Sequence, residues 1–475
     1  MNAILLAAGH VVMTCLLAGA VALSLLLTMQ SVYTLYIMLY TWDRPEASRM
    51  AKAPTRFLPP RRSFTVLLPA RHEEDVIQTT IDGVVRANYP LSLLEVMVIC
   101  SIDDHGTIAK AQQKIAQLRH QGVENVRVLA FKNRPITKPH GLNVGLRHTH
   151  NEVVTIFDAE DDIHPDIFNV INTVLLNEPV AVVQGGVQLM NYQSKWYSVL
   201  NVLEYFFWFK SRLHYHARLG MTPLGGNTVF FTREVLQRVG GWDELDLTED
   251  ADIGIRISLL GERMRVIYDD RYVTREETPP TLSQFIKQRT RWSQGFLQTL
   301  LKGDWKQLPR LKQRLLAVYT LGFPAMQAVL GLYILASVLM MFAFKVPELV
   351  ALLLDLPFYL LAAHFILNVI GLYEFTDAHG LKPTWKTPLV MALGYLPYQW
   401  VLAYASVCAT TRQLRGINNW EKTQHIGAHR QAGKLEVKTP PQAHREVEVV
   451  SSAHRQAEAF EATSLPTSRR ENGFH

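Results

Sequence analysis

Apolar residues are concentrated in long runs on either side of a central segment of mixed polarity in this 475-residue chain. From Met1 to Thr41 the only groups able to carry a charge are the terminal amine and His10, and Leu315–Phe344 contains no charged side chain. A helix needs about 20 apolar residues to cross a bilayer, so both runs predict membrane spans. The first run is also longer than a cleaved signal peptide and lacks its basic start.

Composition divides the chain into six consecutive segments. They are an N-terminal transmembrane region of one long or two short spans (1–42), a juxtamembrane linker rich in Pro and Arg (43–63), a soluble α/β domain (64–275), an amphipathic stretch at the membrane interface (276–314), a C-terminal transmembrane region with about three apolar blocks (315–410) and a polar tail (411–475). Beyond about Lys434 the tail has too few apolar residues to bury a core, so we expect it to be disordered.

The soluble segment alternates strand-like apolar runs with helical patterns. The predicted strands are Phe64–Leu68, Val96–Cys100, Val126–Leu129 and Val153–Phe157, and the predicted helices are Val76–Ala87 and Thr107–Gln121. This alternation is typical of an α/β fold with a mainly parallel, doubly wound sheet. Ligands bind such sheets at the carboxyl ends of the strands, and this is where polar clusters occur in the sequence.

The formal net charge of +6 arises largely beside the apolar runs. Basic residues follow the first run and precede the second, at Arg44, Arg49, Lys52, Arg56, Arg61, Arg62, Lys302, Lys306, Arg310, Lys312 and Arg314. Lys and Arg that flank a span mark its cytosolic side, so we expect a cytosolic central segment and no nucleic-acid partner. Three spans after that segment would place the tail outside, whereas Arg412, Arg415 and Lys422 favour the inside, and the sequence leaves both alternatives open.

Carboxylates gather after two of the predicted strands. Asp103 and Asp104 follow the second strand, and Asp158, Glu160 and Asp161 follow the fourth. Several carboxylates at one edge repel each other unless a cation lies between them, and Mg²⁺ or Mn²⁺ prefers such oxygen ligands together with phosphates. The clusters therefore predict a metal–diphosphate site, with a solvated loop whose acids cap the next helix as the alternative.

The motif LTEDADIGIRI begins a helical pattern with Thr248, Glu249 and Asp250. Thr before acidic residues is an ordinary N-cap. If Asp250 instead faces a substrate, its carboxylate can act as a general base toward an acceptor hydroxyl.

The motif QRTRW lies in a stretch whose apolar residues suit an amphipathic helix along the membrane. Gln288 and Arg291 are one turn apart on such a helix and can reach the same ligand. Arg291 suits a diphosphate and Trp292 suits a sugar ring, and the alternative is that Arg291 and Trp292 only anchor the helix at the interface.

Taken in order, the Asp103/Asp104 pair, DAED, TED and QRTRW resemble the signature of the family 2 glycosyltransferases, in particular the membrane-bound branch with cellulose, hyaluronan and chitin synthases. The resemblance covers about Phe64 to Leu300 and extends to KPHGLN, to GGN and to WEKTQH after the last apolar run. It implies a nucleotide-sugar-binding A-type glycosyltransferase fold, with transmembrane helices on both sides of the domain. It also implies a multi-pass protein of a bacterial inner or plasma membrane.

The resemblance also implies roles for individual residues. Glu73 and either Asp103 or Asp104 would contact the nucleotide base and ribose, and Asp158 and Glu160, with Lys138 nearby, would hold the diphosphate and the metal ion, Mg²⁺ or Mn²⁺. Asp250, beside Thr248 and Glu249, would be the catalytic base. Gln288, Arg291 and Trp292 would hold the diphosphate and the acceptor's terminal sugar, and Gly225, Gly226 and Asn227 would line the acceptor site. Two positions depart from the family pattern. The metal motif reads Asp-Ala-Glu instead of Asp-x-Asp, so Glu160 or Asp161 supplies the second ligand, and His72 stands where many relatives carry Asn.

The function implied is an inverting, metal-dependent transfer of a hexose from a UDP-sugar, with UDP-glucose as the expected donor, to a growing β-linked polysaccharide at the membrane. One alternative is a non-processive glycolipid synthase that adds one or two sugars to a diacylglycerol or polyprenyl lipid. The other is a non-catalytic membrane scaffold. The expected partners are the UDP-sugar, a polysaccharide or lipid acceptor and the bilayer, and secretion partners are left open.

Overall fold

The computed structural model describes residues 2–343 and 346–418. The predicted disordered tail beyond Lys434 and the WEKTQH motif lie outside the described residues. Seven strands form the main sheet in the order β3-β2-β1-β4-β7-β5-β8. Their bounds are β1 Phe64–Pro69, β2 Leu94–Ser101, β3 Val126–Phe131, β4 Val153–Ile156, β5 Val182–Gly185, β7 Val229–Thr232 and β8 Met264–Ile267.

The sheet is mainly parallel, as the alternating pattern predicts. Strand β1 pairs in parallel with β2 and β4, β2 with β3, and β5 with β8. Strand β7 runs antiparallel to both β4 and β5, which the sequence did not reveal. Two further strands, β6 (Val187–Leu189) and β9 (Thr274–Glu276), form a separate parallel pair.

The register brings the carboxyl ends of the parallel strands to one edge. Phe64 lies opposite Leu94 of β2 and opposite Val153 of β4, so β1, β2 and β4 run in step. The polar segments that follow them therefore leave the sheet side by side. This places the DAEDD loop beside the loop of Glu73, far apart in sequence.

The helices match the predicted positions in the first half of the domain. Within the described residues the helices outside the membrane regions are α2 Pro45–Ala51, α3 Ile77–Val85, η1 Leu91–Leu93, α4 His105–His120, α5 Lys138–Arg147, α6 Ile167–Asn177, α7 Ser198–Phe207, η2 Trp208–Arg212, α8 Leu213–Leu219, α9 Arg233–Val239, α10 Glu249–Leu259, α11 Leu282–Lys302 and η3 Asp304–Gln307. Helix α11 begins after Thr281, whose side chain accepts a hydrogen bond from the Gln284 amide, and ends at Gly303 with φ 82°. Such a cap and a left-handed glycine are typical helix boundaries.

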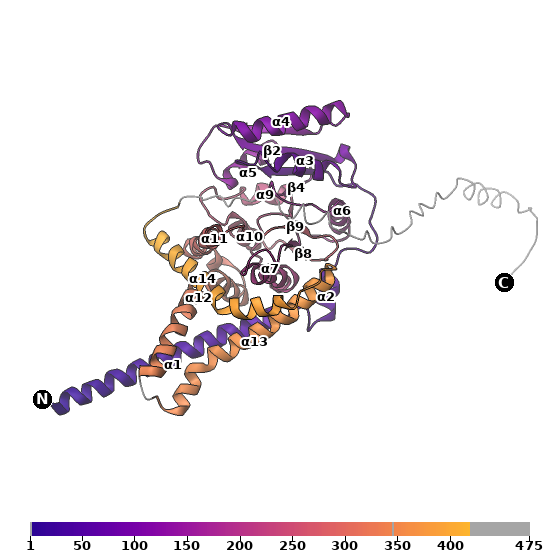
Figure 1. Ribbon diagram of the computed structural model, residues 1–475. Helices are drawn as coiled ribbons and strands as arrows, with labels where there is room; N and C mark the ends of the chain where they lie inside the picture. The colour runs from indigo at the N-terminus through magenta and orange to yellow at the C-terminus, as the bar shows by residue number, and fades with distance from the viewer. Residues whose placement is uncertain (1, 344–345, 419–475) are drawn as a thin grey trace, which may run out of the picture. The chain divides into compact units, whose positions relative to one another are not determined.

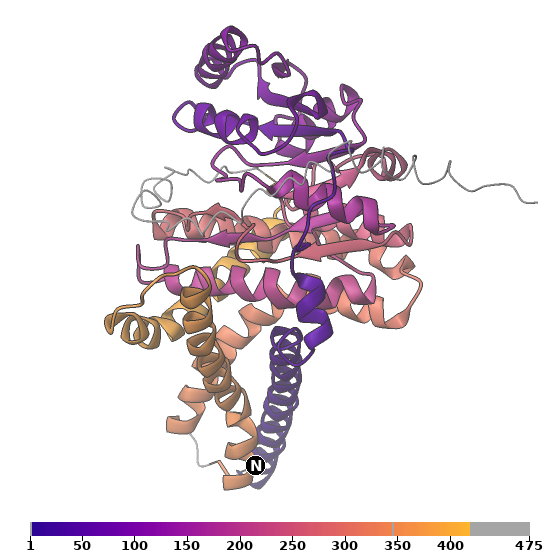
Figure 2. The same ribbon diagram turned by 90° about the vertical axis from the view of Figure 1, so that its right-hand side faces the viewer.

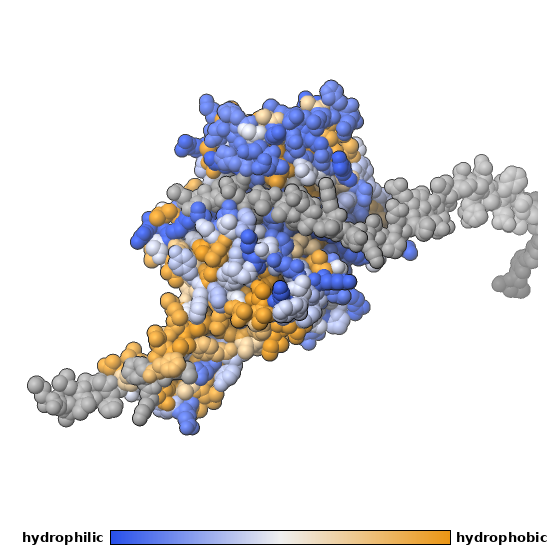
Figure 3. Space-filling model, viewed as in Figure 1, coloured by the Kyte–Doolittle hydropathy of each residue, from blue (hydrophilic) through white to orange (hydrophobic). Residues whose placement is uncertain are grey.

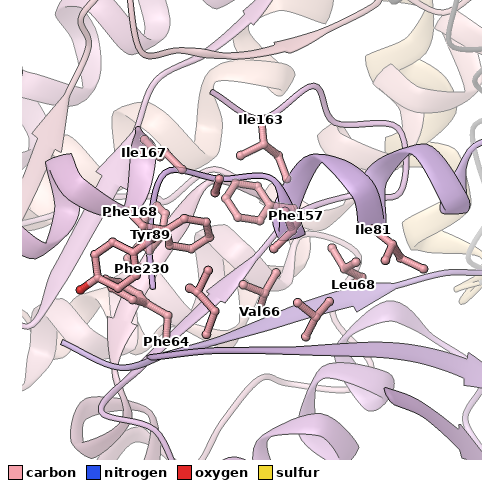
Figure 4. Packing of buried hydrophobic residues seen from close by; sticks show 14 of the residues in the cluster. Phe64, Val66, Leu68, Ile81, Tyr89, Phe157, Ile163, Ile167, Phe168 and Phe230 are labelled. Carbon is pink, nitrogen blue, oxygen red and sulfur yellow. The ribbon is translucent and has the colours of Figure 1, made fainter. Parts of the chain in front are cut away.

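Helices cover both faces of the sheet, and an apolar core lies between the sheet and the helices on each face. The strands are apolar throughout because both of their faces are buried. Alternate residues of β1 separate the two faces, with Val66 and Leu68 on one and Leu67 on the other. On the first face the rings of Phe64, Phe168 and Phe230 pack edge to face, and Figure 4 shows this aromatic cluster against the strands. The sheet is therefore a rigid support for the loops at its carboxyl edge.

Three helices of the described chain are long and apolar enough to cross a membrane. They lie in α1 (Asn2–Met38), α12 (Leu311–Ala343) and α13 (Glu348–Ala378), and the apolar stretches are Val11–Met38, Leu311–Met340 and Glu348–Ala378. Figures 1 and 2 show α1 running beside α13, away from the sheet, in agreement with their close packing. Orange, apolar residues cover this part of the surface in Figure 3.

The third predicted apolar block forms α14 (Lys386–Leu414), which is not among these three helices. It packs along α11 and α12. Tyr398 and Leu402 on one side of α14 are buried, whereas Leu393, Trp400 and Tyr404 are exposed. An apolar outer face over a buried inner face suits a helix that lies along the membrane surface, against the domain.

Candidate active site

A cavity of about 490 Å³ lies at the carboxyl edge of the sheet and continues between the apolar helices α1, α12 and α13. Most of the predicted site residues line it, namely Glu73, Lys138, Asp158, Glu160, Gly225, Gly226, Asn227, Thr248, Glu249, Asp250, Gln288, Arg291 and Trp292. Three predicted residues, Asp103, Asp104 and Asp161, do not line this cavity. The fold thus brings residues from six separate segments of the sequence to one place.

Lys138, the first residue of α5, connects three parts of the site. Its Nζ donates to Oδ1 of Asp158 at 2.6 Å and to the carbonyl oxygen of Gly226 at 3.0 Å, and it lies 4.0 Å from Oε1 of Glu249. Burial by itself would lower the pKa of Lys138, but Asp158, Glu249 and Asp250 together raise it. The ammonium therefore stays charged and balances the acids of the cavity.

Asp161 holds the loop of Asp158 in place. Its Oδ2 accepts from the Asp158 amide at 2.8 Å, and its Oδ1 accepts from Nδ2 of Asn227 at 2.9 Å. Burial, with Glu276, Asp158 and Glu160 nearby, raises the pKa of Asp161. Of the two candidates for a second metal ligand, Glu160 faces the cavity and Asp161 faces the protein.

The cavity-facing acids fit a hard divalent cation. Asp158 and Glu160 offer carboxylate oxygens from one loop, and these suit Mg²⁺ or Mn²⁺ together with phosphate oxygens. Burial is the main cause of the raised pKa of Asp161, and the neighbouring carboxylates of Glu276, Asp158 and Glu160 add to it.

A second acidic cluster is already satisfied by a lysine. One oxygen each of Asp243, Asp246 and Asp252 lies within 4.8 Å of the others. The Nζ of Lys302 is 2.6 Å from Asp243, 2.6 Å from Asp246 and 3.0 Å from Asp252. The ammonium takes the place that a metal ion would need, so this cluster ties the end of α11 to the region before α10.

Glu249 and Asp250 lie in the first turn of α10. Burial raises the pKa of Glu249 to about 7, and Lys138 and Arg291 oppose this shift while Asp250 adds to it. Burial also raises the pKa of Asp250 above its ordinary value. A carboxylate pair with raised pKa values in a cavity is suited to take up a proton near neutral pH.

Helix α11 approaches the start of α10 at Gly295. A Cβ on Gly295 would lie 2.4 Å from Oγ1 of Thr248, so only glycine permits this contact. Nη1 of Arg291 donates to the Leu247 carbonyl oxygen at 3.4 Å, and its charge lowers the pKa of Glu249 and Asp250. The helix with QRTRW is therefore fitted to the acidic pair.

Trp292 is held by its own helix and by α7. The Arg289 guanidinium lies 4.7 Å from the centre of the Trp292 ring and pairs with Oε2 of Glu204 at 2.5 Å. The Tyr205 ring is 6.2 Å from the Trp292 ring. Trp292 is partly exposed to the cavity, where it can stack on a sugar.

The predicted nucleotide contacts separate into different environments. Glu73 lines the cavity. Asp104 caps α4 by accepting from the Thr107 amide at 3.2 Å, and it also accepts from the His72 amide at 2.7 Å. Asp103 is exposed, so of the pair it has the carboxylate that can reach solvent and ligands. His72 has φ 54°, so this departure from the family pattern coincides with a left-handed backbone.

Some residues of the site were not found from the sequence. Glu276 at the end of β9 lines the cavity and accepts a hydrogen bond from Asn227. Thr228 follows the GGN loop with φ 51°, and non-glycine residues in this conformation are strained and cluster at functional sites. A Cβ on Gly226 would lie 3.2 Å from Oδ2 of Asp250, a packing constraint with no signal in a single sequence.

The mainly parallel sheet carries at its carboxyl edge one cavity lined by both acidic and basic groups. Residues 59–295 match the family model described as "Glycosyltransferase like family 2". This part of the chain is thus a family 2-like glycosyltransferase domain, and the protein is an enzyme of this class. The alternative of a non-catalytic scaffold is therefore set aside.

Relatives include synthases of different products. The poly-beta-1,6-N-acetyl-D-glucosamine synthase of Staphylococcus epidermidis is 24% identical, over 75% of this chain and 86% of its own length. The beta-monoglucosyldiacylglycerol synthase of Nostoc sp. is 27% identical, over 50% of this chain and 49% of its own. The probable glycosyltransferase YdaM of Bacillus subtilis is 25% identical, over 50% of this chain and 56% of its own length. The chain thus spans about half the length of the latter two.

One similar solved structure is that of the mannosyltransferase PcManGT of Pyrobaculum calidifontis in complex with GDP-Man and Mn²⁺. It matches this chain with a TM-score of 0.48 and 20% sequence identity. The similarity covers 83% of this chain and 99% of that chain.

Proposed function

We propose that this enzyme transfers a hexose from a UDP-sugar, with UDP-glucose as the expected donor, to a growing β-linked polysaccharide at the cytosolic face of a bacterial inner or plasma membrane. The observation that carries the proposal is the continuity of one cavity from Asp158 and Asp250 to side chains of α1, α12 and α13. An acceptor that reaches Asp250 from the membrane side fits this arrangement. The match with a polysaccharide synthase over 86% of that relative supports a polymer as the product.

The proposed reaction is a single displacement with inversion. The Asp250 carboxylate takes the proton of the acceptor hydroxyl, whose oxygen forms a bond to the anomeric carbon as the bond to the UDP oxygen breaks. UDP leaves with the bonding electrons on the face opposite the attack. Lys138 and Arg291 place positive charge beside the leaving diphosphate, and such preorganised charge is usually a large part of catalysis.

A divalent metal ion is part of the proposal. Asp158 and Glu160 would hold Mg²⁺ or Mn²⁺, which, when bound, supplies positive charge to the diphosphate. Glu73 and the exposed Asp103 are proposed to contact the base and ribose. The GGN loop is proposed to lie along the acceptor.

We also infer a topology in which the tail returns to the catalytic side. In this topology α1 enters the membrane region from the far side and α12 and α13 form an out-and-back pair, so the three candidate spans of the described residues each cross once. In the proposed topology α14, which packs on α11 and α12, does not cross, and Arg412 and Arg415 lie on the same side as the domain. This topology agrees with the basic residues that flank the spans. It also explains why three apolar blocks after the central segment are followed by Arg412 and Arg415, which favour the cytosolic side.

The test is product analysis with radiolabelled UDP-glucose and the purified full-length protein in lipid nanodiscs with Mg²⁺ or Mn²⁺. A labelled polymer with β linkages supports the proposal, and Asp250→Asn is expected to abolish it. The matched control is Asp304→Asn, which removes a carboxylate in η3, outside the cavity. Unchanged transfer by Asp250→Asn would remove the proposed base.

A glycolipid synthase is the second candidate, favoured by the opening of the cavity between apolar helices. In that case the label is found in an organic-soluble glycolipid instead of a polymer. Trp292→Ala separates the two candidates further. Loss of stacking is expected to shorten a polymer, whereas the addition of one sugar depends less on it.

A further inference from the structure

Arg212 brings a positive charge to the lining of the cavity. It is the last residue of η2, a single π-helical turn, and π-turns inside helices often mark functional sites. Its Cζ lies 5.0 Å from the centre of the Trp208 ring and 5.4 Å from that of Phe323. Among the residues that the structure describes, no carboxylate pairs with it, and its buried Nε has no acceptor.

Other cations that line the cavity differ from Arg212 in this respect. Lys138 pairs with Asp158, Arg289 pairs with Glu204, and Arg291 lies beside the acidic pair of α10. The neighbouring His216 adds no compensating charge, because burial, together with the Arg212 guanidinium, lowers its pKa to about 3. The charge of Arg212 is therefore available for a ligand.

Arg212 lies at the level where the apolar stretch of α1 ends, which is the level of the lipid head groups if α1 crosses a membrane. The Ser211 hydroxyl donates to the carbonyl oxygen of Ile37 at 3.0 Å and accepts from the Thr41 amide at 3.2 Å. Ile37 lies at the end of the apolar stretch Val11–Met38, so η2 is level with the end of a span. A group of tyrosine rings lies at this level and suits the aromatic belt of a membrane interface, namely Tyr33, Tyr36, Tyr40, Tyr215 and Tyr319.

The same π-turn also reaches the catalytic end of the cavity. Phe209, one turn before Arg212, lies so close to Gly225 that a Cβ on that glycine would be 3.1 Å from the Phe209 ring. Gly226, the next residue, is packed against Asp250. On the membrane side, Gln327 of α12 and Asn368 of α13 line the cavity. A ligand at Arg212 thus has apolar helices behind it and the acidic pair ahead of it.

We infer that Arg212 binds the phosphate of a membrane lipid whose chains lie between α1, α12 and α13 and whose polar end points toward Asp250. A guanidinium matches the geometry of a phosphate, and a charge at this depth inside a cavity calls for an anion. A neutral polysaccharide has no group that would balance this charge. Only the direction of the polar end rests on the proposed function; the phosphate site itself does not.

The test measures lipid retention by the purified full-length protein, without any sugar donor. Native mass spectrometry compares bound phosphatidylglycerol with diacylglycerol of the same acyl chains, which lacks the phosphate. The wild type is expected to retain one phosphatidylglycerol in preference to diacylglycerol. Arg212→Gln is expected to weaken this retention by about tenfold or more, the scale of a lost charge-assisted hydrogen bond, and Arg212→Lys by less.

The matched control is Arg218→Gln. Arg218 also lies against an aromatic ring, that of Tyr40, and donates to the Tyr40 hydroxyl, but it does not line the cavity. Its substitution is expected to leave retention unchanged. Size-exclusion chromatography checks that each variant is folded. If Arg212→Gln does not fold, Arg212→Lys takes its place: it is expected to retain less phosphatidylglycerol than the wild type, and retention equal to the wild type would contradict a guanidinium–phosphate contact.

Three results would overturn the inference: equal retention by Arg212→Gln and the wild type, equal retention of diacylglycerol and phosphatidylglycerol, or release of the lipid by millimolar inorganic phosphate. The last would assign the site to free phosphate instead of a lipid. Asp250→Asn separates this inference from the proposed function. It is expected to retain lipid like the wild type while losing transfer, so failure of one does not imply failure of the other.

Discussion

The Nζ of Lys138 lies 2.6 Å from Oδ1 of Asp158, and this contact joins the start of α5 to the loop that follows β4. Because the same Nζ also donates to the Gly226 carbonyl oxygen, the lysine connects the proposed metal loop to the acceptor loop. A positive charge in this position can stabilise the folded site by holding the two loops together. It can also stabilise the transition state of the proposed reaction by facing the leaving diphosphate. The first prediction separates these two roles.

Lys138→Met is expected to lower kcat by about 10²- to 10³-fold, as for loss of one preorganised donor at a developing negative charge. Lys138→Arg should recover part of the activity because it keeps the charge. The measurement is initial rate with UDP-glucose, together with the Kd of UDP by calorimetry. Lys132→Met, at an exposed position, is the control, and equal rates for both variants would contradict the role of Lys138.

The rate should rise with pH through an apparent pKa near 7. Burial raises the pKa of Glu249 to about 7, and burial also raises the pKa of its neighbour Asp250, the proposed base. The macroscopic value belongs to the pair. Glu249→Gln is expected to remove the step near 7, which a kcat/KM profile from pH 5 to 9 would show.

The same shift has a consequence for stability. Because the folded pKa of Glu249 is above its ordinary value of 4.5, the folded state holds the proton longer than the unfolded state. The contribution of Glu249 to the free energy of unfolding is therefore largest below pH 4.5 and falls as the pH rises to about 7. Chemical unfolding at pH 5 and pH 7 should show a smaller difference in Glu249→Gln than in the wild type.

Gly295→Ala is expected to reduce activity by about 10²-fold, because the new Cβ pushes α11 away from Thr248 and displaces Arg291. Gly83→Ala in α3 is the matched control, since nothing lies within 4 Å of its Cβ position. That control should keep full activity and gain slight stability. Equal activity of the two variants would show that α11 has room to adjust.

Lys302→Met should destabilise the fold without removing a metal site. The substitution leaves Asp246, whose side chain is fully buried, without its cation. We expect a loss of at most about 3 kcal/mol, the lower end for a broken buried pair, because Lys302 is partly exposed. Lys306→Met, which affects only a contact over Trp305, is the control in thermal unfolding. Recovery of stability by added Mn²⁺ would instead indicate that the three acids bind metal.

Chelation of divalent cations with EDTA is expected to abolish transfer, and added Mg²⁺ or Mn²⁺ should restore it. Glu160→Gln should raise the metal concentration for half-maximal rate by about tenfold or more, because it removes a carboxylate ligand. Asp161→Asn should mainly lower the melting temperature, because Asp161 is buried and holds the Asp158 amide. The reverse pattern, with Asp161→Asn raising the metal requirement, would assign the second ligand to Asp161.

The sequence by itself determined the α/β class, the positions of strands β1 to β4, and the apolar runs of α1, α12 and α13. These features follow from local periodicity and composition, because a strand or span is defined by the polarity of its own residues. The motifs with Asp158, Asp250 and Arg291 were recognisable for the same reason. Each motif places carboxylate or guanidinium side chains at the end of a strand, at the start of a helix or on one face of a helix, and these positions can be recognised from neighbouring residues.

Only the tertiary structure decided which side chains face the cavity. Asp104 and Asp161 turn toward backbone amides, while Asp158 and Glu160, in the same loop as Asp161, line the site. The antiparallel strand β7 and the packing of α14 on α11 depend on partners far along the chain. A residue's own sequence neighbourhood does not contain these partners, so their hydrogen bonds and contacts become visible only when the chain is folded.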